Sequence, residues 1–422
     1  MRYGLNDFPP PLAFFLYGVQ WWIVTLPSVV ILGAVVTRLH FTDVAAQVWY
    51  LQKLLAVLGT ATVVQVLIGH RLPLVIGPAS TLLVGILASI AVGVDALYTA
   101  IFLGGILLAV AGFSGMLAYV RVFFTPRIVA VVLVLIAFTL SPTILRLIGE
   151  GAGGGIFPFC FAFVTVFALL CINDILKGVF KSLTVLIGLI GGTLAFCFFR
   201  GVPAGFSAPL GSTAAFSWTI SPEFHPGTLL AFVFCFLALT VNELGSIEAV
   251  GQMLNADGMD SRTRRGVGFA GLANAVSGGL GVIGPVDFSL SAGLITATGC
   301  ASRFALIPAG AGLALCAFFP KFVMILGAIP GPVMGALLLY LMAAQLASGL
   351  IMLAAGKGVT DFTSGMTVGL PLMVGIIISF APASIFNAFP EMLRPVIGNG
   401  FVMGTLAVII LEHGIFRKRQ TA

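Results

Sequence analysis

The sequence predicts an all-α, polytopic membrane protein, and three observations support this fold class. Of the 422 residues, 59% are hydrophobic and 8% are charged, whereas a soluble domain carries about a quarter charged residues. Apolar stretches long enough to cross a bilayer follow one another along the whole chain. The tetrapeptide VIGP occurs twice, at 75–78 and 282–285, about half a chain length apart. A separate soluble domain is excluded because its surface would need far more charge.

Fourteen spans follow from a bilayer core about 30 Å thick, which a helix of about 20 apolar residues crosses. The predicted spans are residues 12–36, 48–69, 73–92, 94–119, 127–148, 157–176, 182–200, 226–254, 266–283, 286–302, 304–325, 330–355, 365–386 and 395–416. Seven spans followed by seven more place the second half in the membrane with the opposite orientation, as an inverted repeat. In this repeat the two VIGP segments begin the third and tenth spans, which are equivalent elements.

The third and tenth spans are expected to be broken. Their sequences, LPLVIGPASTLLVGI at 72–86 and GLGVIGPVDFSLSAGLI at 279–295, mix Pro and Gly into stretches that should cross the membrane. Such residues at mid-membrane depth favour an extended segment followed by a half-helix. The free N–H groups of two half-helices would then meet near the midplane and attract electronegative ligand atoms, as in a transporter's binding site. The other interpretation is a pair of Pro-kinked helices with no ligand between them.

The distribution of Lys and Arg indicates the orientation of the spans. With a cytoplasmic N-terminus, fourteen of the 20 basic residues lie in cytoplasmic segments. The six on the outer side are Arg38, Lys53, Arg146, Arg200, Lys321 and Arg394. This asymmetry fits the positive-inside bias. We therefore expect both termini in the cytoplasm and a multi-pass protein of a bacterial-type inner or plasma membrane.

Other function classes find little support in the sequence. The six cysteines show no CxxC spacing and the four histidines are scattered near span ends, so no metal site and no cofactor is expected. No Ser-His-Asp set converges, and we do not expect an enzyme. Broken helices that meet at mid-depth describe an occludable site rather than the continuous pore of a channel. A nucleic-acid partner is not expected either.

Few acidic residues fall within the predicted spans, and a carboxylate at bilayer depth usually marks a bundle interior, a water-filled path or an ion relay. Glu243 lies about 17 residues into the eighth span, where it either takes part in a proton path or accepts hydrogen bonds from neighbouring polar groups. Asp287 begins the tenth span and is either a ligand residue or the N-cap of the half-helix. The polar residues expected around the site are Gln20, Ser80, Asn242, Glu243, Ser246, Ser289 and Ser291.

Four motifs spread over nearly the whole chain carry a family resemblance. They are YGVQWW at 17–22, NELGSIEAVGQML at 242–254, GPVDFSLSAGLITATGCASR at 284–303 and IPGPVMG at 329–335. The last motif fits the Ile-Pro-x-Pro-Val-x-Gly sequence of the nucleobase-ascorbate transporters, the xanthine/uracil permease family. The other three are similar to that family's first-, eighth- and tenth-span motifs. The sequence therefore resembles this family.

The resemblance implies a core domain that carries the substrate and a gate domain. The core would comprise residues 1–120 and 222–325, and the gate, with an external connector, residues 121–221 and 326–422. The family typically forms homodimers through the gate domains, moves its substrate in an elevator-like manner and, in bacteria, is coupled to protons. The implied partners are a small-molecule substrate, a coupling cation such as H⁺, the lipid bilayer and a second copy of the chain.

The sequence departs from the family at the positions that contact the substrate. Placed without gaps on the resemblance, the eighth-span Glu falls on Asn242 and the residue after it in the motif on Ser246. The tenth-span positions fall on Leu290 and Ser291, the third-span aromatic residue on Ser80 beside Ala79, and the first-span His on Trp21 next to Gln20. These residues, with Ser289, form the expected substrate site.

The substitutions change the chemistry that the site offers. Asn242 still presents a donor and an acceptor to a base edge, whereas Leu290 presents neither. Trp21 either supplies a stacking face for a planar ring or faces lipid beside Trp22. Glu243 lies about 100° round the helix from Asn242, so it reaches the cavity only after a local register shift, or serves as a displaced proton site. Glu243 and Asp287 are the expected ion-coupling residues.

Two functions remain open at this point. The first is a secondary transporter of a small planar nucleobase-like solute, such as a purine or uracil, with H⁺ as the expected coupling ion. The second is a transporter of a small organic or inorganic anion on the same fold, because two positive helix ends and few carboxylates suit an anion.

Overall fold

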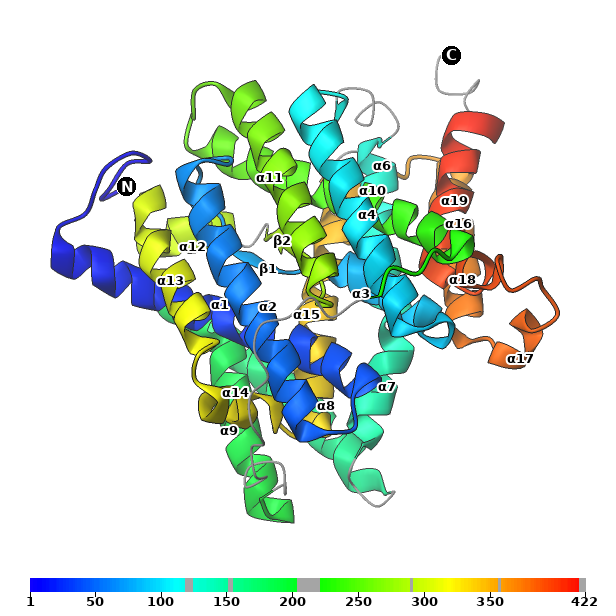
Figure 1. Ribbon diagram of the computed structural model, residues 1–422, viewed down its shortest axis with the longest axis horizontal. Helices are drawn as coiled ribbons and strands as arrows, with labels where there is room; N and C mark the ends of the chain where they lie inside the picture. Colours follow the sequence, from blue (N-terminus) through cyan, green and yellow to red (C-terminus); the bar gives the residue numbers. More distant parts are fainter. Residues whose placement is uncertain (118–123, 151–154, 203–220, 289–290, 356–357, 417–422) are drawn as a thin grey trace.

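Both VIGP segments form a strand that leads into a short helix, which confirms the interrupted third and tenth spans. The elements are β1 (Ile76–Pro78) before α3 (Ser80–Ser89), and β2 (Pro285–Asp287) before α12 (Ser291–Thr298). The strands pair antiparallel with Pro78 opposite Pro285, so the two VIGP prolines face each other. Figure 1 places the pair near the middle of the molecule, and every strand residue is buried. This short sheet is the departure from the predicted all-α fold.

The computed structural model describes residues 1–117, 124–150, 155–202, 221–288, 291–355 and 358–416, so residues 203–220 of the external connector lie outside it. The remaining elements of the first half are α1 (Pro11–His40), α2 (Val44–Leu67), η1 (Ile90–Val92), α4 (Val94–Ser114), α6 (Pro126–Thr139), α7 (Ser141–Gly149), α8 (Ile156–Ile175), η2 (Gly178–Leu183) and α9 (Thr184–Arg200). Those of the second half are α10 (Pro226–Met253), α11 (Met259–Gly279), η4 (Arg303–Leu306), α13 (Ile307–Cys316), α14 (Pro320–Gly327), α15 (Gly331–Ala355), α16 (Phe362–Phe380), α17 (Ala383–Phe386), α18 (Arg394–Ile397), α19 (Gly400–Ile409) and η5 (Ile410–Ile415).

Residues with side-chain acceptors start several of these helices. The Asp43 carboxylate accepts the N–H of Ala46 at the start of α2, and the Thr125 hydroxyl accepts that of Ile128 in α6. Asp361 and Ser364 form a reciprocal capping box at α16. Hydrogen bonds from Ser364 lower the pKa of the exposed Asp361 carboxyl. Such caps satisfy the N–H groups that a helix start leaves without partners.

Eight helical segments in the described part are long and apolar enough to cross a membrane. They are α1, α2, α4, α6 with α7, α8, α10, α15 and α16. Shorter apolar helices are α3 with η1, α9, and α19 with η5. The count of fourteen spans stays a prediction, because length and apolar character do not by themselves identify half-helices as spans.

The predicted continuous span 304–325 is wrong. Its two parts, Arg303–Cys316 and Pro320–Gly327, are bent by 91° relative to each other. Pro320 occupies the first turn of α14, and a proline there cannot donate the backbone hydrogen bond that would continue the preceding helix. Phe319 before it leaves the helical region, at φ −112° and ψ 79°, as residues that precede proline usually do.

The helix packing repeats between the two halves. The second span of each half packs against the fourth span of the other, as α2 against α13 and α4 against α11. Glycines bring the backbones close: a Cβ on Gly59 would overlap the backbone of Ala314, and one on Gly271 would overlap that of Ala109. Small residues allow this approach in membranes, where the hydrophobic effect does not drive helix association. The equivalence of the two contacts agrees with an inverted repeat.

Gly271→Leu is expected to destabilise the α4–α11 contact. Forcing a larger side chain into a packed interface costs about 1–3 kcal/mol. Here the Leu side chain would overlap backbone atoms of Ala109, which cannot move away by changing a rotamer. The thermal unfolding temperature of the purified protein in detergent should therefore fall. Gly191→Leu in α9 is the matched control, because a Cβ there meets nothing within 4 Å. Equal unfolding temperatures for the two variants would contradict the close approach.

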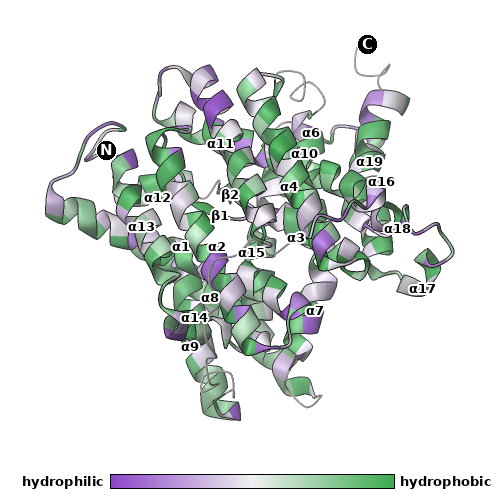
Figure 2. Cartoon of the chain, in the orientation of Figure 1, coloured by the Kyte–Doolittle hydropathy of each residue, from purple (hydrophilic) through white to green (hydrophobic). Residues whose placement is uncertain are grey.

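Apolar side chains cover much of the outer surface. Figure 2 shows hydrophobic residues along most helices, and large exposed side chains include Phe163 and Phe167 in α8 and Leu194 and Phe198 in α9. A soluble monomer does not expose apolar surface so widely, so this surface is suited to lipid.

Two ion pairs join elements near the helix ends. Arg127 at the start of α6 lies 2.6 Å from the buried Glu412 in η5. Arg38 at the end of α1 pairs with Glu150 after α7 and also donates to the carbonyl of Ile329. Glu412 is therefore a neutralised, structural carboxylate, unlike the carboxylates at the strand pair.

Candidate functional site

Hydrogen bonds fasten the strand pair to the start of α12. The Phe288 N–H donates to the Val75 carbonyl (2.8 Å), and the Ala79 N–H donates to the Gly284 carbonyl (2.9 Å). The Ser291 hydroxyl accepts the Val75 N–H (2.9 Å) and donates to the Phe288 carbonyl (2.6 Å). Ser291 therefore joins the two broken spans, and its hydroxyl is used within the protein.

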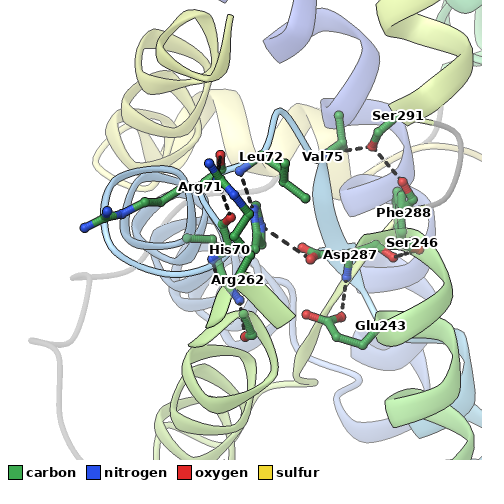
Figure 3. A network of polar contacts seen from close by, with 12 residues as sticks. His70, Arg71, Leu72, Val75, Glu243, Ser246, Arg262, Asp287, Phe288 and Ser291 are labelled. Atoms are coloured by element: carbon green, nitrogen blue, oxygen red, sulfur yellow. Dashed lines mark hydrogen bonds and ion pairs between the residues drawn. The ribbon is translucent and has the colours of Figure 1, made fainter. Parts of the chain in front are cut away.

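Two side chains of α10 reach β2 (Figure 3). Glu243 and Ser246 are three residues apart and so share one helix face. Glu243 Oε2 accepts the backbone N–H of Asp287 at 2.8 Å, and the Ser246 hydroxyl donates to the Asp287 carbonyl at 3.0 Å. Both side chains are buried, with 0% and 1% exposure. They satisfy backbone groups of β2 that a buried strand cannot leave without partners.

The Asp287 carboxylate faces His70, which lies between α2 and β1 (Figure 3). Oδ2 of Asp287 is 3.4 Å from Nε2 of His70, and both side chains are buried. His70 Nδ1 accepts the Leu72 N–H at 2.9 Å. A ring nitrogen that accepts carries no proton, so the neutral ring has its proton on Nε2 and directs it toward Asp287.

Arg262 of α11 lies beside His70. Its Nη1 donates to the carbonyls of His70 (3.1 Å) and Arg71 (2.8 Å). Partial burial and the neighbouring Arg71 and Arg265 lower the pKa of the Arg262 guanidinium, which remains a cation at neutral pH. Arg262 is thus a positive charge that helps to compensate negative charge at the strand pair.

A small cavity lies beside the carboxyl groups. Its volume is about 10 Å³, and its lining includes Gln65, Ile76, Glu243 and Asp287. This is about the least space that holds one water molecule, so no organic solute fits there. Among the described residues, no group of three or more His, Cys, Asp and Glu side chains is arranged to hold a metal ion.

Three of the predicted site residues are partly exposed. Gln20 in α1, Ser80 at the start of α3 and Asn242 in α10 are each half-buried. Gln20 Nε2 is enclosed and finds no hydrogen-bond partner within the described part of the chain. These three residues are thus more accessible than the fully buried residues of the predicted site.

The other predicted site residues are either buried or lie outside the part of the chain that the structure describes. Ala79 and Trp21 have 0% and 2% exposure. A lipid-facing Trp21 is therefore wrong, because α1 packs against α2, α13 and β1 and encloses the ring. Ser289 and Leu290 lie outside the described residues. Asp287 lies in β2, with its carboxylate toward His70 instead of toward a described N–H of α12.

Sequence reasoning missed His70. The sequence shows four scattered histidines, and the position of His70 beside the first VIGP is the signal that could have distinguished it. Asn274 in α11 was missed as well; its amide donates to the Pro285 carbonyl at 2.9 Å and so supports β2. Neither contact follows a helical or strand period: His70 and Asp287 lie far apart in the chain, and Asn274 reaches Pro285 across the turn between α11 and β2.

The sequence and this geometry match a known family. The model of a permease family, the xanthine/uracil permeases, matches residues 12–384. The chain belongs to this family. The permease is accordingly an integral, multi-pass membrane protein, in a family whose members move solutes across membranes.

Curated relatives align with most of the permease. The nucleobase transporter PlUacP of Paenibacillus larvae is 27% identical over 395 residues, which cover 89% of each chain. The uric acid permease PucJ of Bacillus subtilis is 27% identical over 375 residues, covering 84% of the permease and 82% of the relative. The xanthine permease of Bacillus subtilis is 26% identical over 380 residues, covering 86% and 85%.

Solved structures share the fold of the permease at low identity. The transmembrane domain of the cyanobacterial bicarbonate transporter BicA superposes with a TM-score of 0.64 at 14% identity, over 89% of the permease and 98% of that chain. The murine anion transporter Slc26a9 in its inward-facing state gives 0.62 at 12% identity, over 96% and 69%. The permease therefore shares the inverted-repeat fold of these transporters, which confirms the predicted fold class, whereas the count of fourteen spans stays a prediction.

Proposed function

We propose that this permease carries a small planar nucleobase-like solute, a purine or uracil, across the membrane. The observation that carries the proposal is the central strand pair, which leads into the half-helices α3 and α12, with the half-buried Ser80 at the start of α3, Asn242 beside Glu243 in α10 and Gln20 in α1. Two facing half-helices with free N–H groups form a binding site at mid-membrane depth in many transporters. The names of the relatives, which include nucleobase, uric acid and xanthine carriers, agree with this substrate class.

The three partly exposed side chains offer what a base edge requires. Asn242 and Gln20 each bring an amide donor and an acceptor, and Ser80 brings a hydroxyl at the N-terminus of α3. Adjacent N–H and C=O groups of a nucleobase pair with such amides. Because the cavity beside Glu243 is too small for a ring, the substrate would bind on the Asn242 side of α10. Trp21, Ala79, Ser246 and Ser291 would then form the buried part of the site, and Ser289 and Leu290 are proposed site residues outside the described part of the chain.

Uptake by this permease would be coupled to protons, and its core domain would move relative to its gate domain. Glu243 and Asp287 are the candidate proton-coupling residues, because both are ionisable and buried at the strand pair. The core (1–120 and 222–325) would move against the gate (121–221 and 326–422) in an elevator-like step. The excess of Lys and Arg in the predicted cytoplasmic segments supports a cytoplasmic position for both termini. In a homodimer, the second copy of the chain would contact the gate domain.

Ligand-induced thermal stabilisation of the purified protein tests the substrate class. A binder stabilises the folded state by mass action, which requires no knowledge of coupling or direction. Xanthine, uracil and adenine form the nucleobase panel, and sulfate, bicarbonate and acetate form the anion panel. We expect a concentration-dependent rise in unfolding temperature with at least one nucleobase. If no nucleobase raises it while an anion does, the proposal is overturned.

Transport of a small anion is the second candidate. It is favoured by the two half-helix N-termini and by the neutral residues Asn242 and Leu290 at positions where the family resemblance expects acidic or amide groups. Urate separates the two candidates usefully, because it is planar like a purine and anionic at neutral pH. Stabilisation by urate alone would mean that ring shape and negative charge are both recognised.

A further inference from the structure

Two carboxyl groups and one imidazole meet in the interior of the molecule. Glu243 of α10, Asp287 of β2 and His70 before β1 are exposed by 0%, 1% and 0%. Oε1 of Glu243 and both side-chain oxygens of Asp287 receive no hydrogen bond from a donor in the described residues. Ionised carboxylates with so few donors are costly to bury, so the cluster must reduce its negative charge in another way.

A proton shared by the two carboxyl groups would reduce that charge. Glu243 and Asp287 are direct neighbours, because Glu243 Oε2 accepts the Asp287 N–H at 2.8 Å, and two carboxyl groups can bond to each other only when one of them carries a proton. Two adjacent buried carboxylates do not readily ionise together, because each opposes the charge of the other. At least one proton is therefore expected on the pair.

His70 cannot supply the missing positive charge without losing a contact. Protonation of Nδ1 would turn it from the acceptor of the Leu72 N–H, at 2.9 Å, into a second donor facing that N–H. The neutral ring instead directs Nε2–H toward Oδ2 of Asp287. The positive end of the His70 N–H dipole, 3.4 Å from Oδ2, thus favours one negative charge on the pair.

Other charged groups near the cluster are basic. Arg262 donates to the carbonyls of His70 and Arg71, and Arg303 of η4 donates to the Val66 carbonyl at the end of α2. These guanidinium groups lie on the His70 side and leave the carboxyl pair without a direct ion pair. The positive potential of Arg262 and Arg303 lowers the free-energy cost of one negative charge on the carboxyl pair, but it does not neutralise that charge. The pair can therefore exist with one proton, as an anion, or with two, as a neutral group.

We propose that Glu243 and Asp287 form a carboxyl pair that binds and releases one exchangeable proton, and that His70 is the positioning residue that stabilises its anionic form. After release, the pair keeps one proton and one negative charge, which the nearby Nε2–H of His70 and the Asp287 N–H bonded to Glu243 stabilise. This site is separate from Asn242 and Leu290, where the family resemblance expects the substrate-binding side chains. Its role in transport rests on the proposed function, whereas its protonation does not.

Infrared difference spectroscopy of the full-length protein tests the pair without any substrate. A protonated carboxyl group has a C=O stretching band that shifts in D₂O, so acid-minus-alkaline spectra count the protons that buried carboxyl groups gain. We expect the wild-type protein to gain one such band, and the double variant Glu243→Gln with Asp287→Asn to lose it. Glu412→Gln, which removes the buried carboxylate paired with Arg127, should keep the band.

Two His70 variants test the positioning role and do not alter the carboxyl groups. His70→Leu removes the donor to Asp287, so the band should develop at higher pH than in the wild-type protein. His70→Gln keeps an amide N–H at the place of Nε2 and should stay near the wild-type midpoint. An unchanged band in the double variant, or the same midpoint in His70→Leu, overturns the inference. If no nucleobase and no urate stabilised the protein, the proposed function would be overturned. The infrared test of the carboxyl pair would still stand, because it needs no substrate.

Discussion

Asn242→Ala is expected to abolish measurable stabilisation of the permease by its nucleobase ligand. Asn242 is the half-buried amide of α10 next to Glu243 in the chain, and its donor and acceptor would pair with one edge of the ring. Each net hydrogen bond contributes about 0.5–1.5 kcal/mol, so losing two weakens binding by about 10- to 100-fold. The measurement is the ligand-dependent shift of unfolding temperature. The variant should unfold close to the wild-type temperature without ligand, because Asn242 is only half-buried.

Two further variants test whether the effect of Asn242→Ala on ligand binding is specific to this position and to its hydrogen-bonding groups. Asn387→Ala changes an exposed amide in the segment between α17 and α18 and should leave ligand binding unchanged. Asn242→Asp should strengthen binding of a neutral nucleobase, because a carboxylate accepts charge-assisted bonds from ring N–H groups, and should weaken binding of urate by repulsion. Wild-type affinity in Asn242→Ala would show that the eighth-span motif has been placed on the wrong residues.

The broken spans could be predicted from the sequence because their cause is local. Pro and Gly at 77–78 and 284–285 interrupt apolar stretches, and any fold must satisfy the backbone groups that they free. The structure does so by pairing the interruptions, with Pro78 opposite Pro285. The break at Pro320 had the same local signal but was missed, since a proline near the end of a predicted span is also common in continuous helices.

The internal arrangement of the site could not be predicted, because it depends on helix rotation and on contacts between distant segments. Glu243 and Asn242 differ by about 100° on α10, and only packing decides which of them faces β2. In the structure Glu243 lies on the face toward β2, where its carboxylate accepts the Asp287 N–H. Asn242 is half-buried. His70 joins them from more than 170 residues away in the sequence. Its role rests on the Leu72 N–H, a contact that no sequence pattern encodes.

Glu243→Gln is expected to uncouple uptake from the proton gradient. Gln keeps an acceptor for the Asp287 N–H but cannot bind or release a proton, so the carboxyl pair loses its exchangeable proton. In proteoliposomes made with the wild-type protein, accumulation of the transported nucleobase should rise as the external pH falls, because protons then flow inward with it. In the variant, accumulation should stay at the level of equilibration at every external pH, while exchange of labelled for unlabelled substrate continues.

The matched control for this experiment is Glu412→Gln, since Glu412 is also a buried carboxylate, with 5% exposure. Its partner Arg127 lies 2.6 Å away, so the substitution leaves a guanidinium without its counter-ion and should lower the unfolding temperature. It should not alter the dependence of uptake on external pH, because the pair already carries no net charge. Coupled accumulation by Glu243→Gln at the wild-type level would place the proton path elsewhere in the permease. Loss of coupling in both variants would point to a general effect of buried charge, whereas loss in Glu243→Gln alone assigns the coupling to the strand pair.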